Sequence, residues 1–243
     1  MKKITLFSTS LFILFVACAK EDDTDIPEME IDAVVEVLDA YELSIVSYFK
    51  DIALGFEFGN STEVTRKWTT NLNVFIGGET SAELLTEFNR IQNELNELIT
   101  EDFIINRVED SSQSNYYIFF GSGQKYAEIY PSQSGLVSTN WGLFSVFWDA
   151  QDQFTTGYMY VDINKANTLE QKHLLREEFT QSLGLAKDSG LYDDSIFQSE
   201  WTSTTEYSTI DRDLIRLLYH PTMISGLNAA QSETVLRAIL TSE

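Results

Sequence analysis

The chain has 243 residues, with 16 Lys and Arg against 38 Asp and Glu, and a formal net charge of −22. A hydrophobic content of 43% excludes a wholly disordered chain. The acidic excess argues against nucleic acid as a partner, because phosphates are bound by Lys and Arg. A single Cys excludes an internal disulfide and a Cys-rich zinc cluster, and two His leave few metal ligands. No cofactor is predicted.

The N-terminus predicts a lipoprotein signal peptide over residues 1–17. Lys2 and Lys3 precede an apolar run, 11–16, that is too short to span a bilayer. The following Ala17-Cys18 resembles the bacterial lipobox, in which the cysteine receives a lipid. The resemblance implies an exported protein anchored to the bacterial envelope through Cys18, with the outer membrane favoured and surface exposure left open. The alternative is an ordinary signal peptide with an incidental cysteine.

An acidic segment follows the predicted lipidation site. Residues 18–32 hold seven Asp and Glu and one Lys, and such a run repels itself and stays extended. We therefore interpret 18–32 as the lipidated cysteine and a tether between membrane and domain. No second linker or repeat appears beyond it, so residues 33–243 are predicted to form one globular domain.

The predicted elements alternate without a regular βαβ rhythm, which favours an α+β fold. A helix is predicted over 33–50. Thr80 with Glu83, and Thr168 with Gln171, match the capping box that opens a helix, and Gly184 suits the end of the second of these helices. Further helices are expected at 211–219 and 232–240. Strands are predicted over 52–58, 68–76, 103–108, 115–120, 143–148 and 157–163.

The helix that ends near Gly184 carries the most unusual pattern. Residues four apart share a helix face, so Leu175, Phe179 and Leu183 are predicted to face the core. The same spacing places His173, Glu177 and Gln181 on another face, with Glu178 beside them.

This segment resembles the zinc-binding helix of zincin metalloproteases, whose extended motif is HExxHxxGxxH. Glu178 falls on the catalytic glutamate, which serves as general base in that motif, and Gly184 falls on the turn glycine. The three histidine positions are Glu177, Gln181 and Lys187. The resemblance implies a zincin-like domain in which a mixed sheet packs on an N-terminal helix and on an active-site-type helix.

The chain as a whole resembles an uncharacterised bacterial family of predicted lipoproteins. The resemblance lies in the EExxQxLGL pattern of Glu177 to Leu185, in the Ser195-Ile196-Phe197 turn, and in the Asp211 to Tyr219 helix. The function of that family is not established, so the resemblance implies a domain of unknown function.

The substitutions at the ligand positions decide the expected chemistry. Glutamine is a poor zinc ligand and protonated lysine is none, so no metal is predicted and zinc proteolysis is not expected. We hypothesise that Lys187 occupies the space of the lost metal and pairs with Glu177. The alternative is a plain solvated helix face, in which Arg176, Glu177 and Glu178 all point to water.

Two classes of function remain open. The first is a non-catalytic scaffold for binding or assembly, with a protein or glycan ligand that the sequence does not identify. The aromatic segment Asn140–Trp148 is either a ligand platform or, as we favour, a core strand. The second class is a peptidase-like hydrolase with Glu178 as general base, acting without a metal or with one held by carboxylates.

Overall fold

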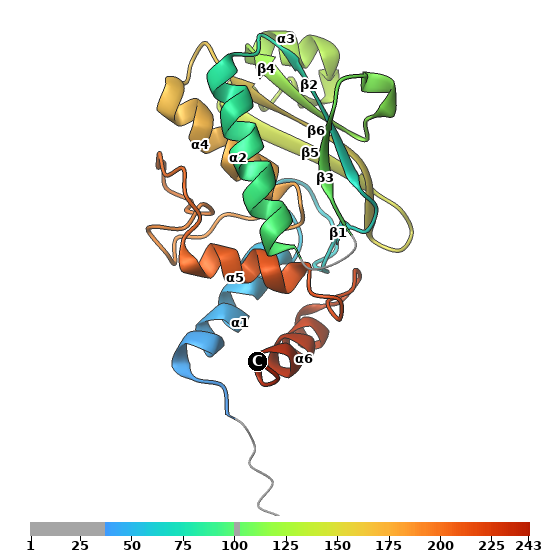
Figure 1. The fold of residues 1–243 in the computed structure, drawn as a ribbon, viewed down its shortest axis with the longest axis vertical. Coiled ribbons are helices and arrows are strands. Elements are labelled where there is room, and N and C mark those ends of the chain that lie inside the picture. Colours follow the sequence, from blue (N-terminus) through green and yellow to red (C-terminus); the bar gives the residue numbers. More distant parts are fainter. Residues whose placement is uncertain (1–36, 100–102) are drawn as a thin grey trace, which may run out of the picture. The chain divides into compact units, whose positions relative to one another are not determined.

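The computed structural model describes residues 37–99 and 103–243, which belong to one compact unit (Figure 1). The predicted signal peptide, Cys18 and the acidic tether lie outside the described residues. None of the helices in the described part of the chain is both long and apolar enough to cross a bilayer.

A six-stranded mixed sheet organises the fold. The strands are β1 (Lys67–Trp68), β2 (Leu72–Gly78), β3 (Ile105–Val108), β4 (Tyr116–Gly121), β5 (Gly142–Trp148) and β6 (Gln153–Asp162). Their order is β1-β6-β4-β2-β3, and all these neighbours are parallel. β5 pairs antiparallel with β6 alone among the described strands. β5 therefore has one edge that no other strand covers.

The two faces of the sheet carry separate hydrophobic clusters, because side chains alternate along a strand. On β4, Tyr116, Ile118 and Phe120 enter the main core, whereas Phe119 joins a smaller cluster on the opposite face. The smaller cluster is covered by α3 (Gly123–Ile129), which contacts β4 and β6. Short 3₁₀ turns lie at Ser111–Gln113 and Pro131–Gln133.

The remaining helices close the main core. α4 (Thr168–Gln181) contacts β5 and β6, and α2 (Ala82–Leu98) packs beside it. α1 (Ala40–Ala53), α5 (Thr209–Leu218) and α6 (Ala229–Leu240) lie together beyond one end of the sheet (Figure 1). The predicted α+β class with a mixed sheet is confirmed. The N-terminal helix, however, packs mainly on α5 and α6 rather than on the sheet.

Some predicted strands were wrong. The expected strand 52–58 is the buried end of α1 followed by a loop, and Gly55 in that loop has φ +91°, which a strand does not allow. Ile52 and Ala53 are apolar because they end a core-facing helix. The expected strand 68–76 is divided into β1 and β2, and α3 was not predicted.

The two predicted capping positions are each displaced by one residue, too early at α2 and too late at α4. Ser81, not Thr80, accepts the hydrogen bond from the backbone of α2. At α4, Asn167 and Glu170 form the capping box in place of Thr168 and Gln171. A capping box was also formed at α1, where Asp39 pairs with Glu42, so that helix begins at Ala40 rather than at 33.

Candidate functional site

The predicted faces of α4 are confirmed. Leu175, Phe179 and Leu183 are fully buried in the core. On another side of the helix, His173, Glu177, Glu178 and Gln181 all line one cavity of about 840 Å³. The sequence motif therefore marks the floor of the principal cleft in the described part of the chain.

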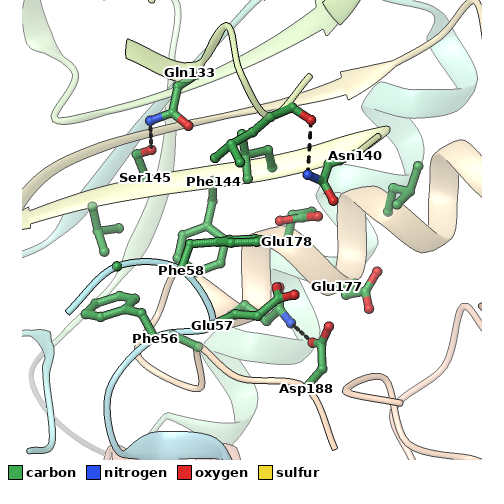
Figure 2. A pocket seen from close by; sticks show the side chains of 18 of the residues that line it. Phe56, Glu57, Phe58, Gln133, Asn140, Phe144, Ser145, Glu177, Glu178 and Asp188 are labelled. Carbon is green, nitrogen blue, oxygen red and sulfur yellow. Dashed lines mark hydrogen bonds between the residues drawn. The ribbon is translucent and has the colours of Figure 1, made fainter. Parts of the chain in front are cut away.

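The walls of the cavity come from distant parts of the chain. All seven residues of β5 line it, together with the loop that follows α1, the segment before β5 and the loop after α4. Figure 2 shows Glu57, Glu177, Glu178 and Asp188 on the same side of the cavity, with Phe56, Phe58 and Phe144 beside them. Among the described residues, no Lys or Arg lines this cavity.

The register of β5 fixes which backbone groups face the cleft. The Asp162 N–H donates to the Trp141 carbonyl at 2.7 Å, and this pair continues the register of Gly142 with Val161. Bonded and non-bonded pairs alternate along an antiparallel ladder. Leu143 and Ser145 therefore bond to β6, whereas Gly142, Phe144 and Val146 direct their N–H and C=O groups toward the uncovered edge. The favoured strand is present, with Leu143 and Val146 buried, but its last two residues, Phe147 and Trp148, are exposed on the cavity wall.

Glu178 lies directly against this edge. A Cβ built on Gly142 would be 2.6 Å from Glu178 Oε1, so the carboxyl group occupies the space that glycine leaves. Burial raises the pKa of Glu178 well above its usual value, and the negative charges of Glu177, Asp188 and Glu57 add to this rise. A hydrogen bond from the Phe144 N–H acts in the opposite direction. Glu178 is thus a carboxyl group that retains its proton more readily than a solvated one.

Asp188 and Glu57 complete the acidic group. The Gln181 side-chain amide donates a hydrogen bond to Asp188, which joins the end of α4 to the loop that follows it. Burial, Glu177 and Glu57 raise the pKa of Asp188 to about 7. Burial and Glu177 also raise the pKa of Glu57, whose backbone N–H is held by the Ala186 carbonyl at 3.2 Å.

His173 is the basic side chain of the cavity wall in the described part of the chain. Its Nδ1 lies 2.7 Å from the Thr204 carbonyl and its Nε2 lies 3.3 Å from Glu177 Oε2. Both partners accept hydrogen bonds, so both ring nitrogens are placed to donate and the arrangement favours imidazolium. Burial would lower the pKa of His173, but the hydrogen bond and charge of Glu177, the hydrogen bond to Thr204 and the charge of Asp188 together raise it.

Lys187 does not fill the space of a metal. Its Nζ pairs with Glu63 Oε1 at 3.2 Å, and the residue is not part of the cavity wall. Within the described residues its ammonium makes no ion pair with Glu177 or Glu178, so the hypothesis of a Lys187–Glu177 pair was wrong. The chain turns at Gly184, whose φ is +122°, and beyond this turn Asp188, not Lys187, lines the cavity.

The alternative of a solvated face was also wrong for Arg176. Its side chain is fully buried, with Nη1 bonded to Glu94 Oε2 at 2.5 Å and Nη2 3.4 Å from Glu87 Oε1. The guanidinium lies 4.3 Å from the centre of the Tyr207 ring. Arg176 therefore joins α4 to α2 and to the segment that holds His173 through Thr204.

The Ser195-Ile196-Phe197 turn and the Asp211 helix, both singled out in the sequence, hold each other. The Ser195 hydroxyl donates to Asp211 Oδ1 at 2.6 Å, and the Ile196 N–H donates to Asp211 Oδ2 at 3.0 Å. Tyr48 from α1 bonds to the same Ser195 hydroxyl. These residues are buried and do not line the cavity, so their part is to fix the loop after α4.

The described residues contain no group of three or more His, Cys, Asp or Glu side chains arranged to hold a metal ion. The three positions that the sequence resemblance set against zinc ligands make other contacts here. Glu177 is engaged by His173, Gln181 by Asp188, and Lys187 lies outside the cavity.

Sequence reasoning missed two members of the site, Asp188 and Glu57. Asp188 lies one residue after the last position of the zincin motif, and that adjacency was the available signal. Glu57 was assigned to a strand, and no local pattern links it to α4. The sequence did bring together Glu177, Glu178 and Gln181, which share the cavity as their spacing predicted.

The fold and site define an α+β protein with an acidic cleft between a helix and an uncovered strand edge. The chain belongs to the family described as protein of unknown function (DUF2927), whose model matches residues 42–238. No curated protein matches the chain.

Proposed function

We propose that this is a non-catalytic binding protein of the bacterial cell envelope, held by a lipid on Cys18. Its cleft receives an extended segment of another polypeptide, which adds as a strand beside β5. The observation that carries this proposal is that β5 directs the backbone groups of Gly142, Phe144 and Val146 away from β6, along a strand that lines the cavity throughout. Such an edge is a template for an added strand.

A substitution pair at Val146 tests the strand addition. Val146→Ala and Val146→Pro both remove the isopropyl group, but only proline removes the N–H, and that N–H faces the uncovered edge rather than β6. Proline is tolerated at such positions on an edge strand. A peptide selected from a random library should bind the proline variant roughly tenfold more weakly than the alanine variant. Equal affinities in two folded variants would contradict strand addition.

The anchor is tested separately by cell fractionation. Cys18→Ser should move the protein from the membrane fraction to the soluble fraction, because a lipid chain supplies membrane affinity that the acidic tether lacks. Retention of the Cys18→Ser protein in the membrane fraction would show that Cys18 is not the anchor.

A hydrolase is the second candidate, and the raised pKa of Glu178 favours it. A carboxyl group whose pKa is raised well above its usual value is suited to proton transfer, and Glu178 lies where a strand added to β5 would pass. Peptide and glycan libraries should be incubated with the protein and with Glu178→Gln. Turnover that disappears in the variant would replace the binding proposal with a hydrolytic one.

A further inference from the structure

The cleft has a charge that its own residues do not balance. Five carboxylate side chains line it, and His173 is the one basic side chain among the described residues of its wall. Two basic side chains adjoin the wall without lining it, and both are paired with other acids. Lys187 pairs with Glu63, and Arg66 pairs with Asp152 at 2.7 Å. The carboxylates of the wall are Glu57, Glu177, Glu178, Asp188 and Glu200.

A second and independent feature surrounds these carboxylates. Four large aromatic side chains are exposed on the cavity wall: Phe58 is 45% exposed, Phe147 49%, Trp148 40% and Trp201 57%. Exposed aromatic groups that gather at one cleft mark a binding surface, and Trp is frequent where binding energy concentrates. Aromatic faces also attract cations. Arg66 already lies 4.5 Å from the centre of the Trp148 ring, from outside the cavity.

We infer that the polypeptide received along β5 presents a Lys or Arg side chain to Glu57, Glu178 and Asp188, and rests apolar neighbours on the aromatic rim. This inference rests on the proposed strand addition. Side chains alternate along an added strand, so a basic residue directed to the acidic floor has residues two positions away on the same face, within reach of the rim. The ligand class is therefore an extended basic segment with apolar neighbours.

The test uses two probe peptides that differ in one charge. The first is acetyl-Ser-Val-Thr-Arg-Thr-Val-Ser-amide, and the second has citrulline, a neutral analogue of similar shape, in place of Arg. Affinities for the purified full-length protein are measured by titration calorimetry. We expect the Arg peptide to bind at least about tenfold more tightly, as a charge-assisted hydrogen bond in a partly buried site allows.

The outcomes separate this inference from the proposed function. Equal affinity for both peptides overturns the basic-residue inference and leaves strand addition standing. Binding of neither peptide contradicts strand addition, and the inference then fails with it. If the Arg peptide binds more tightly than the citrulline peptide, and the Val146→Pro variant binds it more weakly, both the inference and the proposed function are supported.

Charge variants locate the preference within the protein. Glu57→Gln and Asp188→Asn should each reduce the ratio of the two affinities severalfold. Glu83→Gln is the matched control, because Glu83 is exposed on α2 and does not line the cavity. If Glu83→Gln reduced the affinity ratio equally, the preference for the Arg peptide would come from the net charge of the molecule, and the inference would be overturned.

Discussion

At the scale of single residues, the turn after α4 depends on one glycine. Gly184 has φ +122°, and a Cβ at this position would be 2.0 Å from the Arg66 carbonyl oxygen. Beyond the turn, Asp188 lines the cavity and Lys187 does not. The Gly184 position of the sequence motif is therefore explained by backbone geometry, without any metal.

Gly184→Ala should lower the free energy of unfolding by at least about 2 kcal/mol, because a strained backbone and a close contact with a carbonyl act together. Chemical denaturation measures the change. Gly135→Ala is the control, since a Cβ there meets nothing within 4 Å and no positive φ is required. A loss no greater than that of the control would show that the turn adapts easily.

Residue types alone could not identify the whole site. The spacing along α4 was enough to place Glu177, Glu178 and Gln181 together, because helix geometry fixes those relations locally. It was not enough for Glu57, which reaches the cavity through a loop held by the Ala186 carbonyl. The partner of Lys187 was mispredicted for the same reason, since Glu63 lies far away in sequence.

At the scale of elements, α4 is held by a buried cation. Arg176 is fully buried, and its partners Glu87 and Glu94 both lie on α2. Arg90 extends the group by bonding to Glu87 and to the Thr205 carbonyl. This network therefore fixes α4 relative to α2 and to the segment that contacts His173.

Arg176→Met should lower the free energy of unfolding by roughly 3–5 kcal/mol, because it removes one partner of a buried ion pair and leaves the carboxylates uncompensated. Arg107→Met is the comparison: its partner Glu109 is 85% exposed, and such pairs contribute about 1 kcal/mol or less. Urea denaturation of both variants checks the difference. Similar losses would mean that Arg176 contributes no more than a surface charge.

Periodicity predicted most helices and strands, and its errors have physical causes. The apolar run at 52–58 resembled a strand because the buried end of α1 continues into a loop, and period alone does not separate these cases. The position of β5 at an edge depends on which strands pair, a non-local property. Its aromatic residues therefore suggested a core strand, although Phe147 and Trp148 are exposed.

At the scale of the whole molecule, the acidic cleft links stability to pH. Folding raises the pKa of Asp188 to about 7 from an ordinary value of 3.8, and it raises the pKa of Glu57 and Glu178 as well. An acid with a raised pKa binds more protons in the folded state than in the unfolded state. The stability that such an acid contributes is therefore complete below its ordinary pKa, and it is lost as the pH rises through the pKa of the folded state.

The protein should accordingly become less stable between about pH 4 and pH 8. His173 acts with the same sign, because its raised pKa gives a contribution that is present below its ordinary value of 6.5 and is lost at higher pH. Urea midpoints measured across this range should fall as the pH rises. Asp188→Asn should flatten the slope below about pH 7, where Asp188 titrates in the folded state. Glu83→Gln is the control for the change in net charge, because Glu83 is exposed and does not line the cavity. A midpoint that rises with pH over this interval would show that the cleft carboxylates are no harder to ionise in the folded protein than in the unfolded chain.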